Sequence, residues 1–211
     1  MRIRAILFVL SNLLAIGGAA QSLPLLVAIF LDDRGAQRYN DIIGFSVSIL
    51  VALGLGLAGR KYLSKHAKHV GLREGFGVVT SSMVMLSLFG MLPFLFCGAT
   101  NSVTDAFFET MSGFTTTGAT VFPQVEVFSP GLHVWRSMTQ WFGGMGIVVL
   151  SVALLPMLGI GGYRLLKAET PGGVAFERDR PRITDSAKSL CQLYLGLTAV
   201  LAGIFWALGM S

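Results

Sequence analysis

Five stretches of the sequence are long and apolar enough to cross a lipid bilayer as helices. The hydrocarbon core of a bilayer is about 30 Å thick, and roughly 20 apolar residues span it as an α-helix. Backbone groups find no water at that depth, so a helix, which pairs them internally, is the favoured form. The sequence therefore predicts an all-α membrane protein with transmembrane helices over Ala5–Leu31, Ile42–Ala58, Phe76–Phe96, Ser137–Leu158 and Leu190–Leu208.

The composition excludes an ordinary soluble domain. Apolar residues make up 53% of the chain, charged residues make up 13%, and the mean hydropathy is +0.69. In soluble domains about a quarter of the residues are charged. The formal net charge of +5 does not indicate nucleic-acid binding, because the charged residues lie in the gaps between the apolar runs. Membrane lipid is the expected partner, and no nucleic acid is expected.

The first apolar run has two interpretations. Arg2 and Arg4, followed by an apolar stretch that ends at Gly18-Ala19-Ala20, are typical of a secretory signal peptide. Apolar character resumes at Leu23 and continues to Leu31, well beyond a normal cleavage region. An uncleaved first transmembrane helix is therefore the favoured interpretation.

The basic residues predict the orientation of the helices. If the N-terminus is cytoplasmic, thirteen of the sixteen Lys and Arg residues fall on the inner side, and Arg34, Arg38 and Arg136 fall outside. Short cytoplasmic loops carry an excess of Lys and Arg, so this asymmetry predicts an inside N-terminus and an outside C-terminus. The inner residues are Arg2, Arg4, Arg60, Lys61, Lys65, Lys68, Arg73, Arg164, Lys167, Arg178, Arg180, Arg182 and Lys188.

A long external segment, Cys97 to His133, separates the third and fourth apolar runs. Its first part, Asp105–Phe114, predicts a short amphipathic helix that Thr104 or Asn101 could cap. This helix is too short to span the bilayer, so we expect it to dip into the membrane and return. Irregular backbone at that depth is tolerated only where it is buried in protein or lines water. The segment is therefore the predicted functional site.

A threonine-rich stretch, Thr115 to Thr120 with Gly118 inside it, follows this short helix. A cation that sheds its water needs a shell of oxygens, which backbone carbonyls can supply. Glycine reaches backbone angles that are closed to other residues, so successive carbonyls can point the same way. The alternative, from spacing alone, is a polar surface turn that is rich in threonine.

Four segments resemble the Trk/Ktr/HKT superfamily of potassium transport proteins, in the right order. Phe107–Thr120 is similar to the first pore helix and filter of that superfamily, and Trp135–Ile147 is similar to the start of the next helix in its bacterial members. Ala168–Gly172 and Pro181–Thr184 match the cytoplasmic linker that follows. Together these matches extend from residue 107 to residue 184.

The resemblance implies four repeats of helix, pore loop and helix around one potassium pathway, preceded by two extra helices. Here residues 1–72 would hold the extra pair and a basic cytoplasmic loop, 73–162 the first repeat, 163–188 a cytoplasmic linker, and 189–211 the first helix of an incomplete second repeat. The filter segment would comprise Thr115, Thr116, Thr117, Gly118 and Ala119, with potassium bound at Thr116 and Thr117. Potassium would be the transported ion, and no cofactor is expected.

The resemblance also implies a setting and partners. These are the bacterial inner membrane, with the N-terminus in the cytoplasm, a homodimer, and a cytoplasmic nucleotide-binding regulatory subunit. Nothing in the sequence itself predicts a nucleotide site, because it contains no P-loop and no GxGxxG after a strand.

Several residues near the predicted filter have two interpretations each. Arg136 could pair with Glu109 or Asp105 and brace the pore loop, or it could reach the lipid headgroups. Gly143 and Gly144 could let the fourth helix pack closely against the pore helix, or they could mark a kink.

Other aromatic, cysteine and histidine residues are expected to have ordinary roles. Trp135 and Trp141 are interpreted as interface anchors. Cys97 and Cys191 should lie on opposite membrane faces and form no disulfide. His66 and His69 have metal-like spacing, but they lie in a Lys-rich loop, where solvated side chains are the better interpretation.

Three function classes compete. The first is a potassium-translocating subunit, or a part of one. The second is a membrane enzyme, which we do not expect, because the apolar runs contain no cluster of His, Asp, Glu, Ser and Cys. The third is a non-conducting fragment or scaffold that needs companion chains. Since one pore loop supplies about a quarter of a four-loop filter, the isolated chain is not expected to conduct.

Overall fold

A computed structural model describes residues 3–33, 35–64, 72–154 and 180–209 of the chain. Within these residues most of the chain is helical and there is no strand, as expected for an all-α membrane protein. It divides into two compact units, residues 1–143 and 144–211. The helices are α1 (Ile3–Ala20), α2 (Ser22–Leu31), α3 (Ala36–Leu63), α4 (Leu72–Gly90), α5 (Leu92–Phe96), α6 (Val103–Phe114), α7 (Pro130–Leu154) and α9 (Arg180–Ala207), with a 3-10 turn at Val125–Val127.

Four spans in the described residues are long and apolar enough to cross a membrane: Ile3–Leu31, Gln37–Leu63, Gly75–Phe96 and Lys188–Ala207. They correspond to four of the five predicted runs. The fifth, Ser137–Leu158, lies partly outside the described residues, and its described part belongs to α7. The chain is therefore a multi-pass membrane protein.

The helices extend further than the apolar runs that predicted them. Helix α3 begins at Ala36, whereas the apolar run that predicted it begins at Ile42. Helix α7 begins at Pro130 rather than at Ser137. An apolar run marks only the part of a helix that lies in lipid, whereas the helix continues into polar residues on either side. At the start of α7, the Ser129 hydroxyl accepts a hydrogen bond from the Leu132 amide, and Pro130 occupies the first helical turn.

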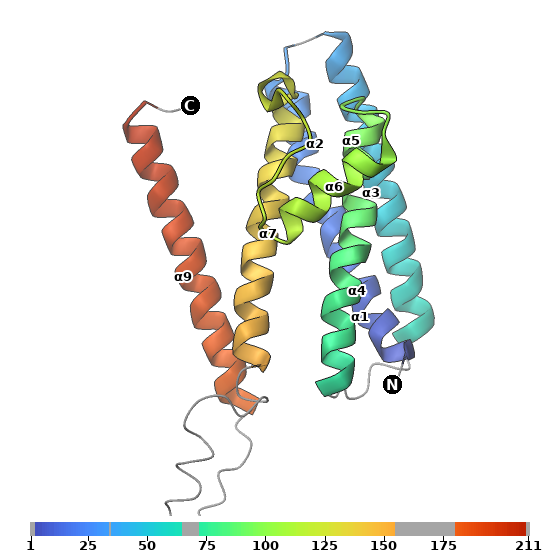
Figure 1. Ribbon diagram of the computed structural model, residues 1–211, viewed down its shortest axis with the longest axis vertical. Coiled ribbons are helices and arrows are strands. Elements are labelled where there is room, and N and C mark those ends of the chain that lie inside the picture. Colours follow the sequence, from blue (N-terminus) through green and yellow to red (C-terminus); the bar gives the residue numbers. More distant parts are fainter. Residues whose placement is uncertain (1–2, 34, 65–71, 155–179, 210–211) are drawn as a thin grey trace, which may run out of the picture. The chain divides into compact units, whose positions relative to one another are not determined.

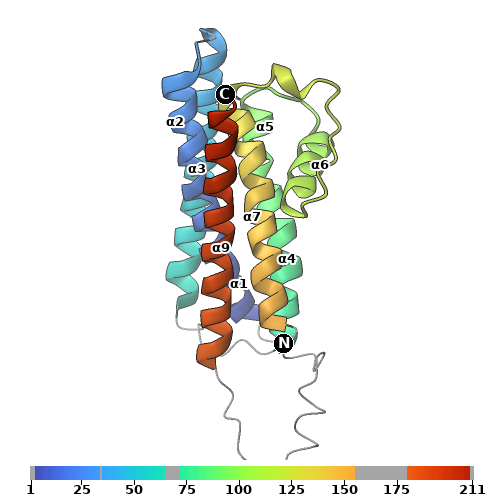
Figure 2. The same ribbon diagram turned by 90° about the vertical axis from the view of Figure 1, so that its left-hand side faces the viewer.

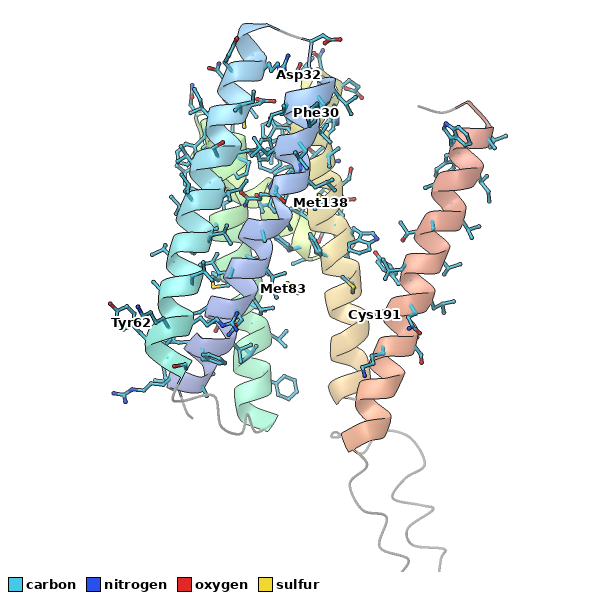
Figure 3. All side chains as sticks on the ribbon, turned by 180° about the vertical axis from the view of Figure 1, so that it is seen from behind. Phe30, Asp32, Tyr62, Met83, Met138 and Cys191 are labelled. Carbon is cyan, nitrogen blue, oxygen red and sulfur yellow. The ribbon has the colours of Figure 1, made fainter. Side chains whose placement is uncertain are left out.

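Small residues hold α1 against α3. A Cβ atom added at Gly56 would lie 2.9 Å from the Cβ of Ala15, and one at Gly18 would lie 2.9 Å from the Cβ of Ala52. Such close approach of backbones is the usual basis of helix association in membranes. Large apolar side chains cover the outer surface instead, among them Phe30 and Tyr62, which are 76% and 82% exposed and are labelled in Figure 3.

Two of the spans are interrupted by a single residue that is not helical. The first is interrupted at Gln21, between α1 and α2, and the third is interrupted at Met91, between α4 and α5. Pro24 and Pro93 lie shortly after these breaks. A proline has no N–H to donate and disfavours a continuous helix.

Between α5 and α7 the chain enters and leaves from the same end of unit 1. Helix α6 descends from the end of α5 to about mid-height of α4 and α5, and the chain then climbs back to begin α7 (Figures 1 and 2). We call residues 103–129 the re-entrant segment. It rests on an apolar cluster whose buried members are Phe45, Phe94, Cys97, Ala106, Phe128, Leu132 and Trp135.

Candidate functional site

Helix α6 begins at Val103, and its cap is Ser102. The Ser102 hydroxyl accepts a hydrogen bond of 3.2 Å from the amide of Asp105, so Ser102 is the N-cap residue. The expectation that Thr104 or Asn101 would cap the helix was wrong. Local patterning did not separate these positions, because Asn101, Ser102 and Thr104 are all good capping residues. The helix starts two residues before Asp105, where the pattern placed its beginning.

Helix α6 packs closely against α4 and α7 at two glycines, Gly90 of α4 and Gly113 of α6 itself. Gly90 of α4 leaves room for Thr110, since a Cβ at Gly90 would lie 2.7 Å from the Thr110 Cγ2. Gly113 approaches Thr139 of α7 just as closely, with 2.9 Å between the added Cβ and the Thr139 Cβ. Thr110 is fully buried, and its hydroxyl donates to the Ala106 carbonyl within α6 at 2.8 Å.

Gly143 and Gly144 have different neighbours. A Cβ at Gly143 would collide with the backbone of Phe114, the last residue of α6, and would lie 2.8 Å from its carbonyl carbon. A Cβ at Gly144 would instead lie 2.7 Å from the hydroxyl of Tyr194 in unit 2. Of the two glycines, Gly143 is therefore the one that contacts α6.

A Schellman motif ends α6 and turns the chain back. The amide of Thr116 donates to the Gly113 carbonyl, and that of Thr117 donates to the Ser112 carbonyl, both at 2.9 Å. This motif places one residue in the left-handed region, usually a glycine. Here the residue is Thr116, with φ +56°, the only non-glycine residue with positive φ in the described chain. Gly118 has φ +73°.

In this turn the backbone amides of the threonine stretch are hydrogen-bonded, whereas its first four carbonyls are not. The amides of Thr115 to Gly118 donate to carbonyls of residues 111 to 113 in the last turn of α6. The carbonyls of the same four residues accept no hydrogen bond from any described residue. All four residues are exposed. The Thr115 hydroxyl lies 2.8 Å from both the Met111 carbonyl and the Thr117 hydroxyl.

Glu109 ties the returning chain to α6 and α7. Its side chain is buried, and one carboxylate oxygen accepts from the Nε of Arg136 at 2.6 Å. The other oxygen accepts from the Thr120 hydroxyl at 2.8 Å and from the Val121 amide at 3.3 Å. Of the two acids considered as partners of Arg136, Glu109 is the one that it contacts. The carboxylate thus joins three segments.

A second tether was missed at the level of sequence. The Ser112 hydroxyl donates to the Ala119 carbonyl at 2.6 Å, so a second bond fixes the end of the stretch beside Thr120. The Thr120 hydroxyl binds Glu109 and also accepts from the Phe122 amide at 3.1 Å. Ser and Thr at these positions give no distinctive pattern, since the same residues are common in any turn.

Trp135 is not an interface anchor. It is 1% exposed, and its indole N–H donates to the Gly90 carbonyl at 2.8 Å. The expectation of an interfacial position was therefore wrong for Trp135. Its ring lies beside Gly90, since a Cβ added there would be 3.4 Å from the Trp135 Cζ2. Trp141 is half-buried, and its ring makes an edge contact with Phe142.

The remaining residues considered for chemistry lie away from the re-entrant turn. Cys97 and Cys191 are both free thiols, and Cys97 is buried in the apolar cluster below α6. Burial raises the pKa of the Cys97 thiol, and the nearby Asp41 carboxylate raises it further. His66 and His69 lie outside the described residues.

Comparison with known proteins identifies the family. The model of the TrkH family, described as a cation transport protein, matches residues 43–210, well over half of the chain. The chain belongs to the TrkH family. The crystal structure of the potassium transporter TrkH from Vibrio parahaemolyticus aligns with all of this chain at a TM-score of 0.82 and 37% identity, over 41% of that structure.

Curated relatives agree with this assignment. The Trk system potassium uptake proteins TrkH of Vibrio parahaemolyticus and of Escherichia coli K12 are each 40% identical over the whole chain. The related protein TrkI of Halomonas elongata is 34% identical over 98% of the chain. The chain spans 40–43% of the length of these relatives.

Proposed function

We propose that this chain supplies one segment of a potassium-selective filter, as part of a four-repeat pore for potassium uptake. The observation that carries the proposal is the orientation of the backbone at Thr115 to Gly118. The amides of these residues are used by the end of α6, whereas their carbonyls accept no hydrogen bond from the described chain. Four consecutive carbonyls on exposed backbone match what a dehydrated cation requires. Thr116 and Thr117 are the central pair, and Ala119 closes the segment.

The direction of α6 supports a cation as the ligand. The C-terminal end of a helix carries a partial negative charge of about half an electron. The threonine stretch follows this end directly, because Phe114 is the last residue of α6 and Thr115 is its C-cap. Glu109 supports the geometry rather than binding the ion, since its carboxylate is buried and already accepts three hydrogen bonds. Arg136 and Gly143 hold α6 from the side of α7.

A single segment supplies about a quarter of a filter built from four loops. The relatives that the chain matches are more than twice its length, and they are named as potassium uptake proteins of a Trk system. The proposed unit of transport is therefore a protein with further repeats. The alternative is a non-conducting fragment or scaffold that needs companion chains.

The proposal includes a domain layout and a setting. Residues 1–72 form the extra helix pair, 73–162 the first repeat, 163–188 the cytoplasmic linker and 189–211 the start of a second repeat. The distribution of Lys and Arg supports a cytoplasmic N-terminus in a bacterial inner membrane. By family resemblance the partners are a second copy and a cytoplasmic nucleotide-binding regulatory subunit. Potassium is the transported ion, no cofactor takes part, and the protein is not an enzyme.

Substitution of Gly118 by serine tests the filter directly. Gly118 has φ +73°, so a side chain strains the backbone and misaligns the neighbouring carbonyls. We expect weaker selection of potassium over sodium by the assembled transporter, measured as competitive rubidium uptake in a potassium-uptake-deficient strain.

Gly98→Ser is a matched control. Gly98 has φ +77°, and nothing lies within 4 Å of an added Cβ at either glycine, so the local strain is equal. Gly98 lies before α6, outside the proposed filter. Selectivity should therefore change for Gly118→Ser alone. If a working Gly118→Ser transporter kept its selectivity, the assignment of the filter would be wrong.

A further inference from the structure

Ser112 holds the threonine stretch through two different groups. Its hydroxyl donates to the Ala119 carbonyl at 2.6 Å. Its backbone carbonyl accepts from the Thr117 amide at 2.9 Å and from the Gly118 amide at 3.5 Å. Ser112 lies in the last turn of α6 and is 6% exposed, so the helix and its neighbours hold it in place. One residue therefore binds the chain on both sides of Gly118.

These bonds fix the direction of the peptide groups between them. A peptide bond is planar and trans, so its N–H and its C=O point in opposite directions. The Thr117 amide points toward Ser112, so the Thr116 carbonyl of the same peptide group points away from it. The Thr117 carbonyl points away as well, because the Gly118 amide faces Ser112. The two central carbonyls of the stretch thus both face away from α6.

The Ala119 carbonyl has the opposite direction, since it points toward the Ser112 hydroxyl. The reversal takes place across Gly118, whose φ of +73° is readily adopted by glycine. The carbonyls of Thr115 to Gly118 accept no hydrogen bond from any described residue. The oxygen of Ala119 is therefore occupied within the protein, whereas the four oxygens before it are available to a ligand.

The direction of the Ser112 hydroxyl is not the usual one for a helix. A serine or threonine inside a helix commonly donates to the carbonyl four residues back. Thr110 and Thr115 do so in the same part of α6. Ser112 donates instead to Ala119, seven residues ahead. Its single proton is thus directed at the returning chain rather than at its own helix.

We propose that Ser112 is a positioning residue that ends the ion-binding segment at Gly118. Its hydroxyl keeps the Ala119 carbonyl off the ion path, so the segment offers four oxygens rather than five. Filters separate potassium from sodium by the size of the site or by the number and field of its carbonyls, and a free fifth oxygen would change both. The inference rests on the proposed filter and assigns a role in it to a residue that does not touch the ion.

Paired substitutions in the assembled transporter test the role of the hydroxyl. Ser112→Ala removes it without adding bulk, whereas Ser112→Val and Ser112→Thr add the same bulk and differ in the hydroxyl. The measurement is the competition of sodium with rubidium uptake in a potassium-uptake-deficient strain. Selection of rubidium over sodium should fall about two- to tenfold in the alanine and valine variants, the range that one neutral hydrogen bond is worth. Ser112→Thr should retain the selection.

Ser102→Ala is the matched control. Ser102 caps the other end of α6, where its hydroxyl accepts from the Asp105 amide at 3.2 Å. Its replacement also removes one serine hydrogen bond from α6, but it leaves the bonds of Ser112 intact. Selectivity should therefore stay at the wild-type value. An equal loss of selectivity in Ser102→Ala and Ser112→Ala would show that general loosening of α6 is the cause, and it would overturn the proposal.

Gly118→Ser separates this inference from the filter itself. If Gly118→Ser weakens selection but Ser112→Ala does not, the filter stands and the role of Ser112 is wrong. If Ser112→Thr loses as much selection as Ser112→Val, the hydroxyl is not the cause, and the role is wrong again. An unchanged selectivity in a working Gly118→Ser transporter would remove the filter and this inference with it.

A high-resolution structure of the wild-type assembly in potassium decides the question even if no Ser112 variant folds. Ion density should lie beside the carbonyls that precede Ala119, and the bond between the Ser112 hydroxyl and the Ala119 carbonyl should be kept. Ion density in contact with the Ala119 carbonyl would overturn the proposal.

Discussion

Replacing Glu109 with alanine should destabilise the protein by about 3 kcal/mol. Removing one member of a buried ion pair costs about 3–5 kcal/mol, because the other charge is left without a partner. The Glu109 side chain is 1% exposed, but that of Arg136 is 22% exposed, so the arginine can recruit water. This partial exposure places the cost at the lower end of the range. The hydroxyl of Thr120 and the amide of Val121 also lose their acceptor, but both residues are exposed to solvent.

Thermal unfolding of the purified protein in detergent, followed by tryptophan fluorescence, measures the effect. A loss of about 3 kcal/mol corresponds to a decrease in Tm of roughly 6–12 °C for a chain of this size. Glu126→Ala is the control, since Glu126 is an exposed acid in the same segment. Surface substitutions of that kind usually change stability by less than about 0.5 kcal/mol.

A double-mutant cycle separates the ion pair from general damage. If Glu109 and Arg136 stabilise each other, the double alanine variant should lose less stability than the sum of the two single variants, by about 1 kcal/mol or more. Additive losses would show that the pair is not coupled. A Tm for Glu109→Ala equal to that of Glu126→Ala would refute the view that this carboxylate holds the returning chain.

Three further substitutions or measurements test the packing of the re-entrant segment. Gly143→Ala should destabilise the protein by an overpacking cost of about 1–3 kcal/mol and so lower its Tm, because the added Cβ meets backbone at the end of α6. Gly146→Ala should leave the Tm unchanged, because nothing lies within 4 Å of the added Cβ. Thr116→Gly should raise the Tm, since a left-handed conformation costs a non-glycine residue about 1–2 kcal/mol. A lower Tm would show that Thr116 is not strained in this conformation. In a Cys191→Ser background, Cys97 should resist alkylation from pH 7 to 9, because burial raises its pKa and the reactive thiolate does not form in that window. Rapid labelling of the native protein would contradict the last expectation.

The sequence was sufficient to predict the helices and the short helix that does not span. Uncharged apolar runs determine where a chain enters lipid, and the described helices α1 to α5 and α9 follow them. The helix boundaries were less predictable, because polar residues such as Gln37, Arg38 and Asn40 continue the helix beyond the apolar core. Polar flanks carry no periodic signal of their own.

The contacts of the site required three-dimensional neighbours. Asp105 and Glu109 are one helical turn apart, so the sequence offered both as partners of Arg136, and the burial of Glu109 distinguishes them in the structure. Trp135 has the composition of an interface anchor, but its position depends on Gly90, which is 45 residues earlier in the chain. Local sequence patterns cover only a few residues, so they could not predict a contact between residues this far apart.

The strain at Thr116 links the stability of the turn to its proposed role. A Schellman motif normally has glycine at the position that Thr116 occupies. Threonine there destabilises the turn by about 1–2 kcal/mol relative to glycine. Strained residues of this kind persist only where the surrounding structure determines them, and they gather at functional sites. Here the two tethers on the returning chain supply that structure, through Ser112 to Ala119 and through Glu109 to Thr120. A glycine would satisfy the turn alone, but it would leave the carbonyls on either side freer to rotate. A threonine held by its neighbours restricts them, and a filter that must present fixed oxygens to an ion benefits from that restriction.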